Sequence, residues 1–168
     1  MLQSIGQWID RHLWALPILI FLIAEVGFIV AHVLRDGAFL LARVDAENRK
    51  EIYSSLTGSS SGLLGFALAA VAIMAAFGRR TASTPDEHNR ENQLADARVG
   101  ISKILLATSL LLMIILVTAT LAIGVDDSKT GSFALTSIIM SAAISSVIGL
   151  LVSCAGLTLS LAERSQQP

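Results

Sequence analysis

The sequence contains few of the residues from which enzyme and cofactor sites are usually built. Its single cysteine, Cys154, excludes an intramolecular disulfide and the paired thiols of a membrane thiol oxidoreductase. The three histidines, His12, His32 and His88, lie in different segments without metal-ligand spacing, and one membrane histidine cannot supply both axial ligands of a bis-histidine haem. Phosphate-loop and H-E-x-x-H motifs are absent. We therefore expect no enzyme activity, no metal and no cofactor.

Charge is scarce as well, and it is balanced. Twelve Lys and Arg residues stand against 13 Asp and Glu residues, which gives a net charge of −1. Such a chain offers no basic surface, so we expect no direct contact with nucleic acid.

Long apolar runs are what the sequence has in abundance. The mean hydropathy is +0.70, and four apolar runs cover residues 13–34, 58–78, 101–125 and 133–161. Each is about as long as the 20 residues that a helix needs to cross a hydrocarbon layer about 30 Å thick. The sequence therefore predicts an all-α integral membrane protein in which residues 13–161 form a four-helix transmembrane domain.

The distribution of Lys and Arg sets the expected orientation. The side that would hold both termini carries seven of these residues and the other side carries five, so the positive-inside rule favours an N-in, C-in topology. Residues 1–12 have an amphipathic pattern with Trp8 on the apolar side, which predicts a helix lying in the membrane interface. Residues 162–168 are expected to be a short C-terminal tail.

The segment between the second and third spans carries a helix-start signal. Thr84-Pro85-Asp86-Glu87 reads as a capping box with proline at the first helical position, so one helix should run from there into the third span. Residues 85–100 would then extend the helix beyond the membrane on the cytoplasmic side. This extension is either a solvated polar helix or a docking site for a cytoplasmic protein. The candidate contact residues are Glu87, Arg90, Glu91 and Arg98.

The segment between the first two spans, residues 35–56, is long for a connection and too apolar for a free loop. We expect a short helix that lies on the outer surface or caps the bundle. Asp45 and Arg49 have the spacing of a favourable ion pair on one helix face.

Small residues mark the second and fourth spans, and such residues let membrane helices approach closely. Gly58, Gly62 and Gly65 form a helix-packing seam in the second span. We expect a homo-oligomeric bundle with the second and fourth spans inside and residues 105–116 of the third span facing lipid. A four-residue stripe in the fourth span either lines a polar path or serves packing, and its members are Ser137, Ser141, Ser145, Gly149 and Ser153.

Glu25 is the only acid inside a predicted span, and His32 follows two turns later on the same face. A carboxyl group at such depth is costly and is by default a functional candidate. Three interpretations remain open: a proton or cation pathway in which Glu25 and His32 tune permeation or gating, an interhelical hydrogen bond to a Ser or Thr of the second or fourth span, and a partner contact.

Around the second span, Ser54-Ser55, Gly58, the Ala69-Ala70 pair and Gly78-Arg79-Arg80 resemble the second helix of RexB-like phage-exclusion membrane proteins. The general four-helix plan is also similar to the membrane subunit of Kiwa defence systems. The resemblance implies a bacterial inner membrane, an ion channel that depolarises infected cells and a role in antiviral defence. It covers some 30 residues and assigns no site residue.

Two hypotheses of function follow. The first is an oligomeric inner-membrane channel or membrane-depolarising effector. The alternative is a non-conducting scaffold that holds a cytoplasmic protein partner through residues 84–103. A proton-coupled transporter is a third reading, although the chain lacks the internal repeats and broken helices common in such proteins.

Overall fold

The computed structural model describes residues 15–35, 41, 43–76, 85–126 and 131–165; of the helical residues 85–91, 93, 94 and 159–165 only the backbone is described. In these ranges the chain is helical, with α2 (Leu16–Leu34), α3 (Ala46–Ala76), α4 (Pro85–Val125) and α5 (Phe133–Ser165). All four helices are long and apolar enough to cross a membrane. The chain thus has the architecture of an all-helical, multi-pass membrane protein. The predicted interfacial helix 1–12 and Thr84 of the capping box lie outside the described residues.

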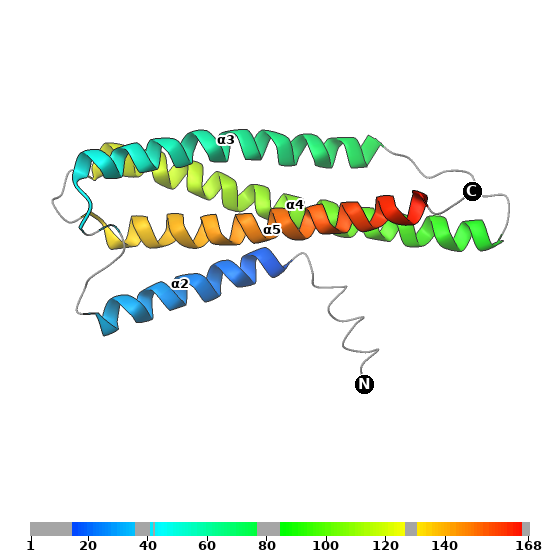
Figure 1. Ribbon diagram of the computed structural model, residues 1–168, viewed down its shortest axis with the longest axis horizontal. Coiled ribbons are helices and arrows are strands. Elements are labelled where there is room, and N and C mark those ends of the chain that lie inside the picture. Colours follow the sequence, from blue (N-terminus) through cyan, green and yellow to red (C-terminus); the bar gives the residue numbers. More distant parts are fainter. Residues whose placement is uncertain (1–14, 36–40, 42, 77–84, 127–130, 166–168) are drawn as a thin grey trace.

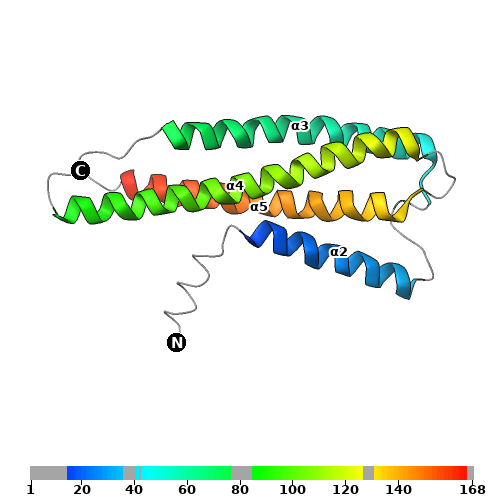
Figure 2. The ribbon, with the colours of Figure 1, turned by 180° about the vertical axis from the view of Figure 1, so that it is seen from behind.

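The helices alternate in direction along the bundle. The start of α2, the end of α3, the start of α4 and the end of α5 all lie toward the same end of the molecule (Figure 1). Helices α4 and α5 form the central pair. Helix α3 packs against α4 and α2 packs mainly against α5, so that α2 and α3 lie on opposite sides of this pair (Figures 1 and 2).

The central position of α4 corrects the prediction that residues 105–116 face lipid. Leu105, Leu111, Leu112 and Ile115 are each buried to 98% or more within the single chain. They fill the space between α3 and α5, while Leu106 and Leu110 on the other side of α4 remain exposed. Large aliphatic side chains of a membrane helix are thus as well accommodated against protein as against lipid tails.

Helix α3 presents the opposite face from the one that was expected to pack. Tyr53, Ser60 and Ala67, spaced by seven residues, are buried in the contact with α4. Gly58, Gly62 and Gly65 are exposed, and a Cβ built on any of them would meet no atom within 4 Å. Within the single chain, α3 therefore uses its hydroxyl- and methyl-bearing face and leaves its glycine face open. The prediction that the second span lies inside a homo-oligomer stays a prediction.

The helix boundaries also differ from the apolar runs. Helix α3 begins at Ala46, twelve residues before the predicted second span, so residues 46–56 continue the spanning helix and form no separate surface helix. One continuous helix does run from Pro85 through the third span, as expected. Helix α5 continues to Ser165, so part of the predicted tail 162–168 is helical.

Candidate functional site

Glu25 lies at the midpoint of α2, nine residues or about 14 Å from either end of the helix. Its two carboxylate oxygens accept hydrogen bonds from α5: Ser137 Oγ donates to Oε1 at 2.8 Å and Ser141 Oγ donates to Oε2 at 2.7 Å. Both distances are typical of well-formed O–H···O hydrogen bonds. The interpretation of Glu25 as a partner in interhelical hydrogen bonds is thereby confirmed for the fourth span. We call Glu25, Ser137 and Ser141 the mid-span cluster.

The serine stripe of α5 continues away from Glu25 along the contact with α2 and α4. Ser145 Oγ donates to the backbone carbonyl of Pro17, near the start of α2. The stripe then loses its hydroxyl at Gly149, but a Cβ at this glycine would collide with Oγ1 of Thr108 from α4. Thr108 therefore places a hydroxyl at the level where α5 has none, and Ser153 follows one turn later with its hydroxyl on the carbonyl of Gly149.

Five hydroxyls thus follow one another through the interior: Ser137, Ser141, Ser145, Thr108 and Ser153. Each of the five residues is at most 2% exposed. From Ser137 to Ser153 the line rises along 16 residues of α5, or about 24 Å. That is most of a hydrocarbon layer about 30 Å thick. The contribution of Thr108 was not predicted, because its hydroxyl belongs to a span that the composition marked as aliphatic.

His32 lies two turns beyond Glu25 on α2, at the far end of the helix. Its ring stacks on Phe133, the first residue of α5, with 3.8 Å between the ring centroids and 11° between the planes. The hydrogen-bond partners of the Glu25 carboxylate among the described residues are the two serine hydroxyls, so His32 is not one of them. His32 and Phe133 instead fix the far end of α2 to the start of α5.

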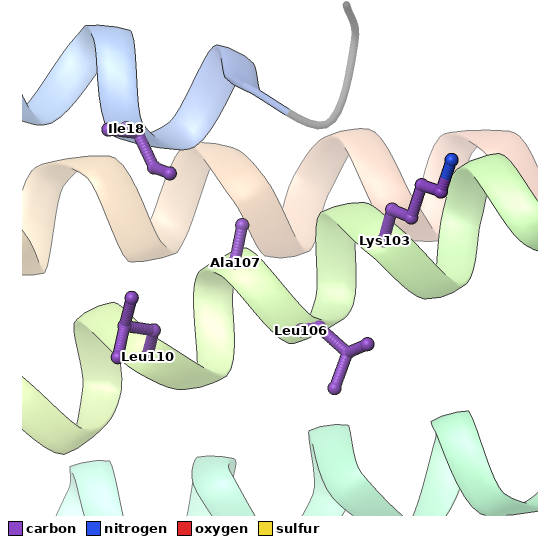
Figure 3. A pocket seen from close by; sticks show the side chains of 5 residues that line it. All are labelled: Ile18, Lys103, Leu106, Ala107 and Leu110. Carbon is purple, nitrogen blue, oxygen red and sulfur yellow. The ribbon is translucent and has the colours of Figure 1, made fainter.

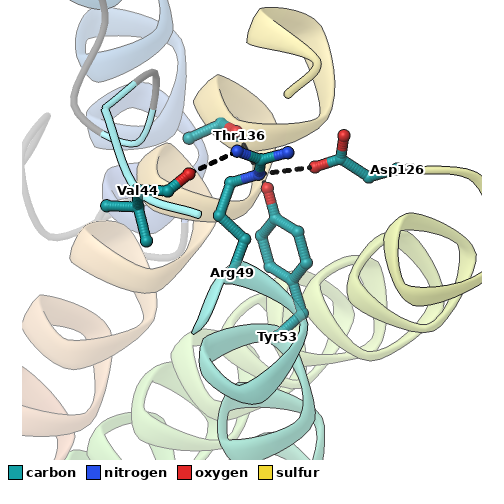
Figure 4. A network of polar contacts seen from close by, with 5 residues as sticks. All are labelled: Val44, Arg49, Tyr53, Asp126 and Thr136. Atoms are coloured by element: carbon teal, nitrogen blue, oxygen red, sulfur yellow. Dashed lines mark hydrogen bonds and ion pairs between the residues drawn. The ribbon is translucent and has the colours of Figure 1, made fainter. Parts of the chain in front are cut away.

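A second polar cluster lies where α3 begins and α4 ends (Figure 4). Arg49 Nε and Asp126 Oδ2 form an ion pair at 3.2 Å, with side-chain exposures of 0% and 1%. A second guanidinium nitrogen of Arg49 donates to the backbone carbonyl of Val44. One turn along α3, the hydroxyl of Tyr53 lies 3.0 Å from Oγ1 of Thr136 on α5. We call Arg49, Tyr53, Asp126 and Thr136 the loop-end cluster.

The backbone next to this cluster is shaped to receive the arginine. Gly131 has a φ of +75°, a left-handed conformation that favours glycine. A Cβ at Gly131 would come within 3.0 Å of Arg49 Nε. The turn before α5 therefore closes over the guanidinium group only because residue 131 has no side chain.

The loop-end cluster was missed by the sequence reasoning. The sequence predicted that Arg49 pairs with the side chain of Asp45. In the structure the Asp45 side chain is exposed, and the backbone carbonyl of Asp45 accepts a hydrogen bond from the backbone N–H of Arg49. The actual partner, Asp126, is 77 residues away. One signal was present: Asp126 directly follows an apolar run, at the depth where a cation from a neighbouring helix end could meet it.

The predicted partner-contact residues are only partly described. Arg98 is half-buried on α4, whereas the side chains of Glu87, Arg90 and Glu91 lie outside the described residues. Within the described ranges, no group of three or more His, Cys, Asp or Glu side chains could hold a metal ion. Comparison with protein-family models, curated proteins and solved structures finds no match to the chain.

Proposed function

We propose that this protein is an oligomeric inner-membrane channel that depolarises the membrane by conducting protons, with Glu25 as the group that takes up and releases the proton. The observation that supports this most is the mid-span cluster. A carboxyl group at the centre of a spanning helix is bonded through both oxygens to a line of buried hydroxyls, and no cation contacts it among the described residues. Carboxyl groups in such positions typically mark ion pathways and proton relays.

The tight packing of the hydroxyl line favours protons over hydrated ions. The interior position of Ser141, Ser145 and Thr108 leaves them with no exposed surface. A hydrated cation requires a water-filled passage, whereas a proton moves along hydrogen-bonded groups. A hydroxyl can both donate and accept a hydrogen bond. In the structure Ser145, Thr108 and Ser153 donate to backbone carbonyls, so a proton path requires these hydroxyls to turn toward one another.

The open glycine face of α3 supports an oligomer. Gly58, Gly62 and Gly65 are exposed next to apolar side chains such as Phe66 and Ile73. A second copy could approach this face closely, as small residues allow in membranes.

The proposal places both termini in the cytoplasm, and the resemblance to phage-exclusion proteins makes antiviral defence the context in which depolarisation would act. The test of the oligomer is disulfide or photo-crosslinking between two copies at the glycine face of α3. This crosslinking should be lost in a Gly62→Leu variant, because the leucine side chain would prevent the close approach.

The test of conduction is proton flux into liposomes that contain the purified protein. A potassium gradient with valinomycin supplies the driving potential, and a trapped pH dye reports protons. Glu25→Gln keeps the size and part of the hydrogen bonding of the side chain but cannot exchange a proton, so flux should fall to the level of empty liposomes. Glu47→Gln, an exposed carboxylate in the first turn of α3, is the matched control and should conduct normally.

Equal flux from wild type and a folded Glu25→Gln variant would refute Glu25 as the proton carrier. No flux from the folded wild-type protein under any imposed potential would instead favour the second candidate, a scaffold. The length of α4 supports that alternative: from Lys103 back to Pro85 the helix extends 18 residues, or about 27 Å. Charge reversal at Arg98 would then release a cytoplasmic partner without changing flux.

A further inference from the structure

An open groove separates α2 from α4 near the start of α2 (Figure 3). Its volume is about 500 Å³, and its lining residues are Ile18, Lys103, Leu106, Ala107 and Leu110. The groove exists because α2 rests mainly on α5 and makes only a small contact with α4. Apart from Lys103, every lining side chain is apolar.

The position of Lys103 along α4 places the groove at one edge of the membrane. No charged residue follows Lys103 until Asp126, and the 22 residue steps from Lys103 to Val125 measure about 33 Å. This matches a hydrocarbon core about 30 Å thick, so the ammonium group lies at headgroup depth. Leu110 lies seven residues, or about 10 Å, further into the apolar layer.

Lys103 carries a positive charge at the edge of the groove. The residue is exposed, and it forms no ion pair with any residue that the structure describes. An ammonium group above an apolar groove is complementary to a molecule with a negative head and a hydrocarbon tail.

We propose that this groove binds one anionic phospholipid, with its phosphate on Lys103 and one acyl chain along Ile18, Leu106, Ala107 and Leu110. The site does not depend on the proposed conduction, because the groove contains none of the hydroxyls of the interior line. It is a lipid site in the leaflet that contains the start of α2. The lipid would bridge α2 and α4 where the protein itself leaves them apart.

Native mass spectrometry of the purified full-length protein tests the site. The protein is titrated with phosphatidylglycerol or with phosphatidylcholine carrying the same acyl chains. Wild type should retain one phosphatidylglycerol per chain in preference to phosphatidylcholine. Lys103→Gln should reduce that preference about fivefold, the effect of one basic residue near an anionic lipid. Arg43→Gln removes an exposed cation at the other end of the bundle and should leave the preference unchanged.

A second variant tests the contribution of the apolar groove independently of the Lys103 charge. Ala107→Leu fills the groove but keeps the ammonium group, so retention of both lipids should fall together. The proposal is overturned if Lys103→Gln keeps the wild-type preference, or if Arg43→Gln lowers it equally. It is also overturned if a crosslinker at Leu106 captures a second chain and no lipid.

Discussion

The loop-end cluster is buried and the mid-span cluster is centred on a half-buried carboxyl group. Both join helices that are distant in sequence, yet their polar groups have different partners. In the loop-end cluster, the Arg49 guanidinium meets the Asp126 carboxylate, and a backbone carbonyl accepts a further bond. In the mid-span cluster, the Glu25 carboxyl meets only neutral hydroxyls. The two clusters touch along the chain, because Thr136 belongs to one and Ser137 to the other.

The two arrangements should respond differently to substitution. Removing one partner of a buried ion pair leaves the other charge buried without that partner, which is costly. Removing a hydroxyl that bonds to the Glu25 carboxyl takes away only one interhelical hydrogen bond. We therefore expect the loop-end cluster to contribute more to stability than the mid-span cluster.

The largest expected effect comes from breaking the ion pair. Asp126→Ala leaves the Arg49 guanidinium buried without its carboxylate, which should lower the free energy of unfolding by about 3–5 kcal/mol. Denaturation of the protein in micelles, followed by circular dichroism, measures this. Glu51→Ala, which removes an exposed carboxylate close to Arg49 in sequence, should change stability by less than about 0.5 kcal/mol. If both substitutions had the same effect, the ion pair would not be a structural joint.

A smaller loss of stability is expected at the mid-span cluster. The double variant Ser137→Ala, Ser141→Ala removes both hydroxyl donors to Glu25 and should destabilise the fold by about 1–2 kcal/mol, since interhelical hydrogen bonds in membranes average about 0.6 kcal/mol each. Proton flux should nevertheless fall strongly. Ser146→Ala is the control, because its buried hydroxyl has no hydrogen-bond partner among the described residues. If the double variant lost as much stability as Asp126→Ala, the two clusters would not differ in their contribution to the stability of the fold.

The smallest effect is expected from Tyr53→Phe, which removes one neutral hydrogen bond from the loop-end cluster. The expected cost is about 1 kcal/mol, with no change in proton flux. Thr136→Val should cost a similar amount, and the two changes combined should cost less than their sum because they remove the same bond. Full additivity in this double-mutant cycle would show that the two hydroxyls do not interact.

Much of the fold could be predicted because the bilayer imposes simple demands on the sequence. Four apolar runs predict four spanning helices, and Pro85 with its acidic neighbours predicts the continuous α4. Glu25 was identifiable as the only acid within a span, and a serine of the fourth span was among its expected partners. These features depend on local composition and on helical periodicity.

The packing partners were harder to predict, for a physical reason. Lipid tails are as apolar as leucine, so burial against protein and exposure to lipid leave the same hydrophobic pattern on a helix. The glycines of α3 and the serines of α5 both permit close approach, but only α5 uses its stripe within the chain. Asp126 directly follows an apolar run, but the local sequence does not identify Arg49, 77 residues away, as its partner.

The sequence separation between Glu25 and its serine partners has a consequence for synthesis and membrane insertion. Ser137 and Ser141 lie 112 and 116 residues after Glu25 in the chain. At a synthesis rate of about 5–20 residues per second, on the order of ten seconds pass between the emergence of the carboxyl group and that of its hydroxyl partners. During this interval α2 must reside in the bilayer with a lone polar group, held there by its flanking aliphatic residues. The hydrogen bonds that join α2 to α5 at Glu25 can thus form only after α5 has been made.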